Sequence, residues 1–257
     1  MAAASFKLGL GQMLVVCGDP EANFARAGRM IREAAAAGCG AVVLPECSDL
    51  GWMAAEAREL AEPIPGPRSG RLGAWAREAG IYVVAGLTER AGEKLYNAAV
   101  LISPAGEILL KHRKINELEI ARELYSTGDR LGVAETPLGV IGVNICADNF
   151  PETLELGRSL ARMGCRILLS PCAWAVEADH DNARDPYGSL WRGSYTTLAQ
   201  ERSMTIAGVS NVGWLTAGPW KGHKCIGCSL AVGPGGVILA QGPYGEEAEA
   251  LIVVEIP

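Results

Sequence analysis

The sequence VNICADNFPE, residues 143–152, decides the fold. An apolar, β-branched run ends there at Cys146, and a Pro-Glu pair then opens a segment with helical spacing. We therefore expect a strand over residues 139–145 and a helix over residues 151–163. A thiol at this junction lies at the carboxyl end of a strand, which is where open α/β sheets place their chemistry. Cys146 is either a nucleophile or, like most cysteines in such runs, a small core hydrophobe.

Alternating strands and helices are also expected before this stretch. Residues 6–16 read as a strand, and Asp19-Pro20 as the start of a helix that Gly38 ends. Residues 41–44 form a short buried strand, and it ends in Pro45-Glu46, which places a carboxylate at its carboxyl end. The other expected elements of this half are a helix capped by Ser69 that runs through Ala79, a strand over 81–87, and strands over 96–102 and 107–110 around a turn at 103–106.

The second half of the chain repeats this scheme. Strands over 166–170 and 205–210 are expected on either side of a helix over 189–202. Residues 230–239 align with 100–109 at a constant offset, with a proline and a glycine matched in the two turns. Any two hairpins can share Pro and Gly, but the order of elements in both halves favours a true repeat. The expected fold is thus α/β, an α-β-β-α sandwich of two mixed sheets with an internal pseudo-twofold repeat.

The composition is that of an ordinary globular protein, with 49% hydrophobic and 20% charged residues in 257. No linker-like segment divides the chain, so residues 1–257 are expected to form a single domain. The net charge of −6 and the scattered basic residues argue against a nucleic-acid partner. Because neither a signal peptide nor a membrane span is recognisable, we expect a cytoplasmic protein whose eight cysteines are free thiols.

Three residues at expected strand or loop ends could act together: Glu46, Lys114 and Cys146. A carboxylate in a desolvated pocket can take the proton of a thiol nucleophile and later return it to a departing nitrogen. A fixed lysine ammonium stabilises the negative charge that develops on a tetrahedral adduct. These groups suffice to hydrolyse a C–N bond, so no metal and no cofactor is expected. Taken singly, each residue has a simple structural explanation, such as a buried ion pair or a solvated basic run.

At this point the chain resembles the carbon–nitrogen hydrolase (nitrilase) superfamily. The likeness rests on three segments that come in that family's order, and it covers essentially the whole chain. They are LPEC at 44–47, KHRK at 111–114 and ICADNFPE at 145–152, and the likeness continues at 168–174, Arg202, 211–213 and 227–229.

The resemblance implies an α-β-β-α sandwich that assembles into a homodimer or a higher homo-oligomer. It also implies a small-molecule amide or nitrile as substrate, and a thioester intermediate on Cys146. Glu46 would be the base and Lys114 the oxyanion stabiliser. The backbone amide of Ala147 would be the second oxyanion donor.

Two positions depart from the family's pattern. Members usually carry a second glutamate before a Pro-Gly-Asp turn, and this chain lacks the proline before Gly128-Asp129. We expect Glu123 to be this substrate-positioning carboxylate, with Glu117 and Glu119 as alternatives. Asn149 stands where carbamoyl-amide hydrolases often have arginine, which makes a carbamoyl substrate less expected.

Substrate contacts are expected from Ala147, Asn149 and Trp174. Trp174 would form a pocket wall, although an indole at this place can also simply pack in the core. The long polar loop over residues 176–188 could act as a lid over the site.

The expected activity is hydrolysis of a small amide to a carboxylic acid and ammonia or an amine. Nitrile and N-carbamoyl amide hydrolysis would use the same residues, so the substrate, whether an amide, a nitrile, an N-carbamoyl amine or an ω-amide, stays open. A protein of a different class, a redox or metal-binding α/β protein, would need Cys225 and Cys228 as its reactive pair. A non-catalytic scaffold with the same fold is a further alternative.

Overall fold

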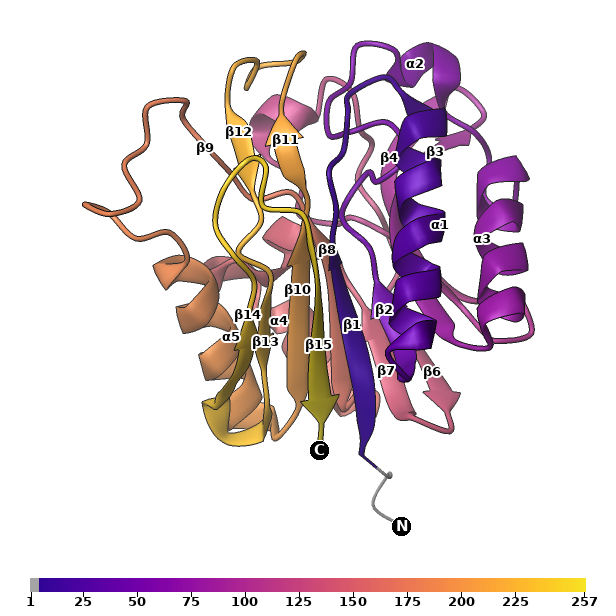
Figure 1. The fold of residues 1–257 in the computed structure, drawn as a ribbon, viewed down its shortest axis with the longest axis vertical. Coiled ribbons are helices and arrows are strands. Elements are labelled where there is room, and N and C mark those ends of the chain that lie inside the picture. The colour runs from indigo at the N-terminus through magenta and orange to yellow at the C-terminus, as the bar shows by residue number, and fades with distance from the viewer. Residues whose placement is uncertain (1–4) are drawn as a thin grey trace.

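The computed structural model describes residues 5–257 and contains two six-stranded mixed sheets that stack face to face. Helices cover the outer face of each sheet, so the molecule has four layers, helix, sheet, sheet and helix (Figure 1). This arrangement confirms the expected α-β-β-α sandwich. None of the helices within residues 5–257 has both the length and the apolar character that crossing a membrane requires.

The first sheet has the strand order β15-β1-β2-β3-β4-β5 and is covered by helices α1 and α3. Asp19 caps α1, because its side chain accepts a hydrogen bond from the backbone N–H of Ala22 at 3.0 Å. The elements are β1 (Phe6–Gln12), α1 (Pro20–Ala36), β2 (Cys39–Val43), α2 (Ala57–Leu60), α3 (Pro67–Ala79), β3 (Tyr82–Ala91), β4 (Lys94–Ile102), β5 (Ile108–Arg113) and, from the other end of the chain, β15 (Ala250–Ile256).

The second sheet has the order β14-β13-β10-β8-β7-β6 and is covered by helices α4 and α5. A small third sheet, β11-β12-β9, extends from it. The elements are η1 (Glu119–Ala121), β6 (Val133–Thr136), β7 (Gly139–Val143), η2 (Cys146–Asn149), η3 (Pro151–Thr153), α4 (Glu155–Arg162), β8 (Ile167–Cys172), β9 (Ala175–Val176), α5 (Ser189–Arg202), β10 (Thr205–Ser210), β11 (Val212–Trp214), β12 (Lys224–Ile226), β13 (Leu230–Val232), η4 (Pro234–Gly236) and β14 (Ile238–Gln241).

Strand pairing confirms the internal pseudo-repeat. In the first sheet β1, β2 and β3 run parallel and are followed by the antiparallel strands β4 and β5. In the second sheet β7, β8 and β10 run parallel and are followed by the antiparallel strands β13 and β14. Each sheet also has one antiparallel edge strand beside its first parallel strand, β15 or β6.

The core lies in three apolar layers, one between the sheets and one beneath each pair of helices. Leu10 of β1, Val43 of β2 and Val143 of β7 belong to the middle layer and are almost completely buried. Burying one such side chain stabilises the fold by about 1.5–3 kcal/mol, so the middle layer holds the two halves together.

Two local expectations are corrected by the structure. Ser69 is not the cap of α3, because Gly66 takes that position and Ser69 Oγ accepts its backbone N–H at 2.9 Å. After Cys146 the chain makes the two short turns η2 and η3, and α4 begins only at Glu155. Residues 151–153 form the turn η3 in place of the first turn of the expected helix, and Phe150 is extended with φ −62° and ψ 155°, as is usual for a residue before proline.

Candidate active site

The sandwich brings Glu46, Lys114 and Cys146 to one cavity of about 250 Å³. Glu46 follows β2 and Lys114 follows β5, both in the first sheet, whereas Cys146 follows β7 in the second sheet. All three side chains line the cavity, although 100 residues separate the first from the last. The predicted meeting of an acid, an amine and a thiol in one place is therefore what the structure shows.

Glu46 and Lys114 form a buried ion pair. Lys114 Nζ donates to Glu46 Oε1 at 2.7 Å, and Asn97 Nδ2 donates to the same oxygen at 2.6 Å. Burial alone would lower the pKa of Lys114, but the carboxylates of Glu46 and Glu117 outweigh it and raise that pKa well above its usual value. Lys114 is therefore a fixed cation at neutral pH.

Gly86 of β3 lets the turn that carries Glu46 pack directly on the sheet. The backbone N–H of Gly86 donates to Pro45 O at 3.0 Å, and its carbonyl accepts from Ser48 N at 2.8 Å. A Cβ at position 86 would lie 2.6 Å from the Cα of Glu46, which is closer than real Cβ atoms approach. Only glycine fits here without moving the Glu46 carboxylate.

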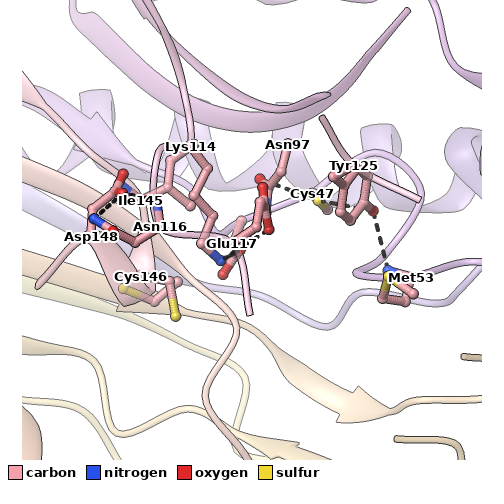
Figure 2. Close-up of polar contacts among 12 residues, drawn as sticks. Cys47, Met53, Asn97, Lys114, Asn116, Glu117, Tyr125, Ile145, Cys146 and Asp148 are labelled. Carbon is pink, nitrogen blue, oxygen red and sulfur yellow. Dashed lines mark hydrogen bonds and ion pairs between the residues drawn. The ribbon is translucent and has the colours of Figure 1, made fainter. Parts of the chain in front are cut away.

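The second carboxyl group near the ion pair belongs to Glu117. Glu123, which was expected to be this second carboxylate, does not lie there. Glu117 Oε2 lies 3.9 Å from Lys114 Nζ, its side chain is buried, and Figure 2 shows the two residues close together near Cys146. Burial raises the pKa of Glu117 to about 8, against the lowering effect of Lys114. Glu119 and Glu123 are both exposed, because they belong to the turn η1 and the segment after it, which pass over the surface.

Cys146 has a left-handed backbone with φ +43°, which is rare for a residue other than glycine. Such a conformation costs about 1–3 kcal/mol and is tolerated where surrounding contacts enforce it. Here the backbone N–H of Cys146 donates to Ser170 Oγ at 3.1 Å, and Asp148 N donates to Ile145 O at 2.8 Å. The turn thus holds the half-buried sulfur at the cavity.

The surroundings of Cys146 favour its thiol over the thiolate. A hydrogen bond with the thiol of Cys172, burial and the nearby Glu46 carboxylate raise its pKa well above the usual value, and Lys114 opposes them only in part. Sulfur therefore needs a base when it attacks, and Glu46 is the carboxylate that shares its cavity.

Asp148 connects the segment that carries Lys114 to the turn that carries Cys146. Its carboxylate lies 2.8 Å from His112 Nε2 and accepts the backbone N–H of Asn116 at 2.8 Å and of Ile145 at 3.0 Å. Burial alone would raise the pKa of Asp148, but these hydrogen bonds and the nearby cations lower it. Figure 2 shows Asp148 beside Asn116 and Ile145. Asp148 and its partner His112 lie within the quoted segments ICADNFPE and KHRK, but no role was predicted for Asp148.

Asn149 does not line the cavity, which corrects its assignment to substrate binding. Its side chain is fully buried behind the nucleophile turn, where Nδ2 donates to Asn144 Oδ1 and to Ser170 Oγ, both at 3.0 Å. Asn144 directly follows β7 and Ser170 lies within β8, so Asn149 fixes the turn to the second sheet. No isolated sequence signal distinguishes this role from a substrate contact, since both call for a polar residue after the nucleophile.

Ala147 and Trp174 line the cavity, as expected. Trp174 is buried and stacks on Trp191 of α5, with ring centroids 4.8 Å apart and planes 20° apart. The polar loop after β9 also reaches the cavity, through His180, Asp185 and Tyr187. The other aromatic wall residues are Trp52, Phe150 and Trp220.

Cys225 and Cys228 are both buried, and burial raises the pKa of Cys228 to about 11 and that of Cys225 further still. The pKa of Cys146 is raised as well, so what distinguishes Cys146 is its place: it lines the cavity beside Glu46 and Lys114, and neither Cys225 nor Cys228 does. Within residues 5–257, no group of three or more His, Cys, Asp or Glu side chains is arranged to hold a metal ion. The geometry therefore favours Cys146 over this pair as the reactive thiol.

Comparison with known proteins agrees with this geometry. A family model described as carbon-nitrogen hydrolase matches residues 7–257. The omega-amidase NIT2 of Xenopus tropicalis is 38% identical over 181 residues, which cover 66% of this chain and 64% of that protein. A nitrilase of Pyrococcus abyssi is 32% identical over 249 residues, covering 93% of this chain and 85% of that protein.

Among solved structures, an amidase from Nesterenkonia sp. superposes with a TM-score of 0.81 at 23% identity, and the match covers 100% of this chain and 92% of that one. This likeness supports the fold. The chain spans 64% of the length of the first omega-amidase that it matches.

Proposed function

The chain belongs to the carbon–nitrogen hydrolase family, and from this premise we propose that it hydrolyses the C–N bond of small amides through a thioester on Cys146. The products are a carboxylic acid and ammonia or an amine. The observation that carries the proposal is that Glu46, Lys114 and Cys146 line one cavity, with Glu46 and Lys114 paired at 2.7 Å.

Attack begins when the substrate carbonyl carbon reaches the Cys146 sulfur. Glu46 takes the thiol proton as the C–S bond forms, and the carbonyl oxygen takes up the electron pair. The Lys114 ammonium, kept charged by Glu46, stabilises that oxygen together with the backbone N–H of Ala147.

Collapse of the tetrahedral adduct breaks the C–N bond. Glu46 returns its proton to the departing nitrogen, which leaves as ammonia or an amine and leaves a thioester on Cys146. Water then attacks the thioester and gives its proton to Glu46, and the acid departs as the sulfur regains a proton.

Glu117 is the second carboxylate of this mechanism. With its pKa raised to about 8, it is mostly protonated at neutral pH, so it adds no second negative charge beside Glu46. Glu117 does not line the cavity, so it acts through Lys114, whose Nζ lies 3.9 Å from its Oε2.

The test is an ammonia-release assay across small amides, nitriles, N-carbamoyl amines and ω-amides of dicarboxylates. Cys146→Ala is expected to lower turnover by more than about 10⁴-fold while the protein stays folded. Cys17→Ala is the matched control, because Cys17 is equally half-buried but does not line the cavity, and it should keep wild-type turnover. Full activity in Cys146→Ala would contradict the proposal.

We also propose that the protein acts as a single-domain, cytoplasmic homo-oligomer. The eight free cysteines support a reducing compartment, and the family resemblance supports assembly. Light scattering on the purified protein should give a mass of at least twice 27.0 kDa, and a mass of 27.0 kDa would contradict assembly.

A further inference from the structure

Beyond the catalytic groups, the cavity is lined mainly by aromatic and aliphatic side chains, and its other polar members are His180, Asp185, Tyr187 and Ser189. Trp174, Trp191 and Phe150 form one wall, where Trp191 lies 4.8 Å from Trp174 and 5.4 Å from Phe150 between ring centroids. Trp52 and Trp220 form another wall, with centroids 5.1 Å apart. Aromatic walls of this kind favour flat or apolar groups of a ligand.

The cavity offers no spare cation for an anionic substrate. Among the residues 5–257 that the structure describes, Lys114 is the only lysine or arginine in its lining, and its ammonium is already engaged by Glu46 at 2.7 Å. Asp185 of the loop after β9 adds a carboxylate at the cavity. His180, Tyr187 and Ser189 also line the cavity, but a substrate carboxylate would lose its hydration without gaining a lysine or arginine partner, which is unfavourable in a mainly apolar site.

The volume limits what the walls can enclose. At about 250 Å³ the cavity lies below the usual range for sites that hold drug-sized ligands, which is about 300–1,000 Å³. Such a space suits one ring or a short alkyl chain attached to the amide.

We propose that this site selects uncharged primary amides with a small flat or apolar acyl group, and rejects amides whose far end is a carboxylate. The inference rests on the proposed function and narrows it. The name omega-amidase suggests that the relatives act on ω-amides of dicarboxylates. The proposed preference of this chain differs, because such an amide carries a carboxylate that no lysine or arginine in this lining can neutralise.

The decisive comparison uses two substrates of equal length that differ in charge. Succinamate ends in a carboxylate, and 4-oxopentanamide replaces one carboxylate oxygen by a methyl group. We expect kcat/KM for 4-oxopentanamide to exceed that for succinamate by at least about 100-fold, since a site with no partner for a buried polar group rejects it strongly. Phenylacetamide should be used at least as well as 4-oxopentanamide.

A rate for succinamate equal to or above that for 4-oxopentanamide would overturn this inference and leave the proposed function intact. Absence of ammonia release from every amide, butanamide included, would instead overturn the proposed function itself.

A variant pair tests the charge argument separately. Leu118 lines the cavity and has no part in the chemistry, so Leu118→Arg supplies the missing cation and Leu118→Gln is its uncharged control. Leu118→Arg should narrow the ratio between the two substrates by at least about 10-fold, and Leu118→Gln should leave it unchanged. If Leu118→Arg does not fold, Ala175→Arg and Ala175→Gln replace the pair at another lining position. An unchanged ratio in a folded arginine variant would contradict the charge argument.

Discussion

At the scale of single residues, the site depends on how one lysine is shared by two buried carboxyl groups. Glu46 holds Lys114 at 2.7 Å, and Glu117 lies farther away at 3.9 Å. The single charge of Lys114 offsets the charge of one nearby carboxylate, which is Glu46. Glu117 is farther from Lys114, so burial keeps its carboxyl group protonated up to a pKa of about 8. Two glutamates in one site thus differ in protonation: Glu46 is the base and Glu117 is a neutral carboxylic acid.

Glu117→Gln tests whether Glu117 is protonated at neutral pH, through the pH dependence of the free energy of unfolding. Because folding raises the pKa of Glu117 from 4.5 to about 8, wild-type stability should fall as pH rises between these values and level off above them. The total loss is on the order of 5 kcal/mol, and the glutamine variant should lack it. Urea unfolding of both proteins between pH 5 and about 9 measures the difference. Identical pH dependence in the two proteins would show that Glu117 is ionised throughout.

The residues that the sequence predicted best are those whose role follows from their place at a strand end. Glu46 and Cys146 each follow an apolar run that stops abruptly, and that pattern is visible without coordinates. Glu117 and Asp148 lie in irregular segments, where no periodicity tells which way a side chain points. Glu123 was predicted as the second carboxylate because it precedes the turn at Gly128-Asp129. In the structure Glu117 is the buried carboxyl group near Lys114.

At the scale of elements, Asp148 joins the segments that follow β5 and β7. We expect Asp148→Asn to lower kcat by about 10–100-fold with a smaller change in KM, because the substrate walls stay while Lys114 and Cys146 lose their common anchor. Asp148→Ala should lose more, since it removes every acceptor. Glu152→Gln is the control, an exposed acid in the same stretch that should leave both constants unchanged. A rise in KM alone would contradict the positioning role.

Gly86 sets how closely β3 approaches the turn that carries Glu46. Gly86→Ala should destabilise the protein by about 1–3 kcal/mol and lower kcat/KM, because the new methyl group overlaps the backbone of Pro45 and Glu46. Gly70→Ala is the matched control on α3, where the added methyl meets open space and should stabilise by up to about 1 kcal/mol. Thermal unfolding and steady-state kinetics of both variants check the pair, and a stable, fully active Gly86→Ala would refute this account.

At the scale of the whole molecule, the site exists only because two sheets pack together. The first sheet supplies Glu46 and Lys114, and the second supplies Cys146. The pseudo-repeat was predictable, because the order of elements and the two matched turns can be recognised in the sequence. Which strand ends would meet across the sandwich was predictable only through the family resemblance, since periodicity places a side chain on a face of its own sheet and not opposite a partner.

The middle layer should therefore control stability. Leu10→Ala removes a fully buried side chain between the sheets and is expected to cost about 2–5 kcal/mol. Val253→Ala on the neighbouring β15 is the control, because Val253 is 40% exposed and should change stability by less than about 0.5 kcal/mol. Denaturant unfolding of each variant should change the fluorescence and abolish ammonia release at the same denaturant concentration. Comparable losses in the two variants would contradict the assignment of the core.

The most direct test of the central claim is to trap the covalent intermediate. Wild-type protein is mixed with phenylacetamide, quenched in acid within milliseconds, and digested for peptide mass spectrometry. The account predicts a phenylacetyl group on the peptide that contains Cys146, formed together with released ammonia, and absent from Cys146→Ala. An acyl group on any other residue, or turnover with no acylated Cys146 in either wild type or Glu46→Gln, would contradict it.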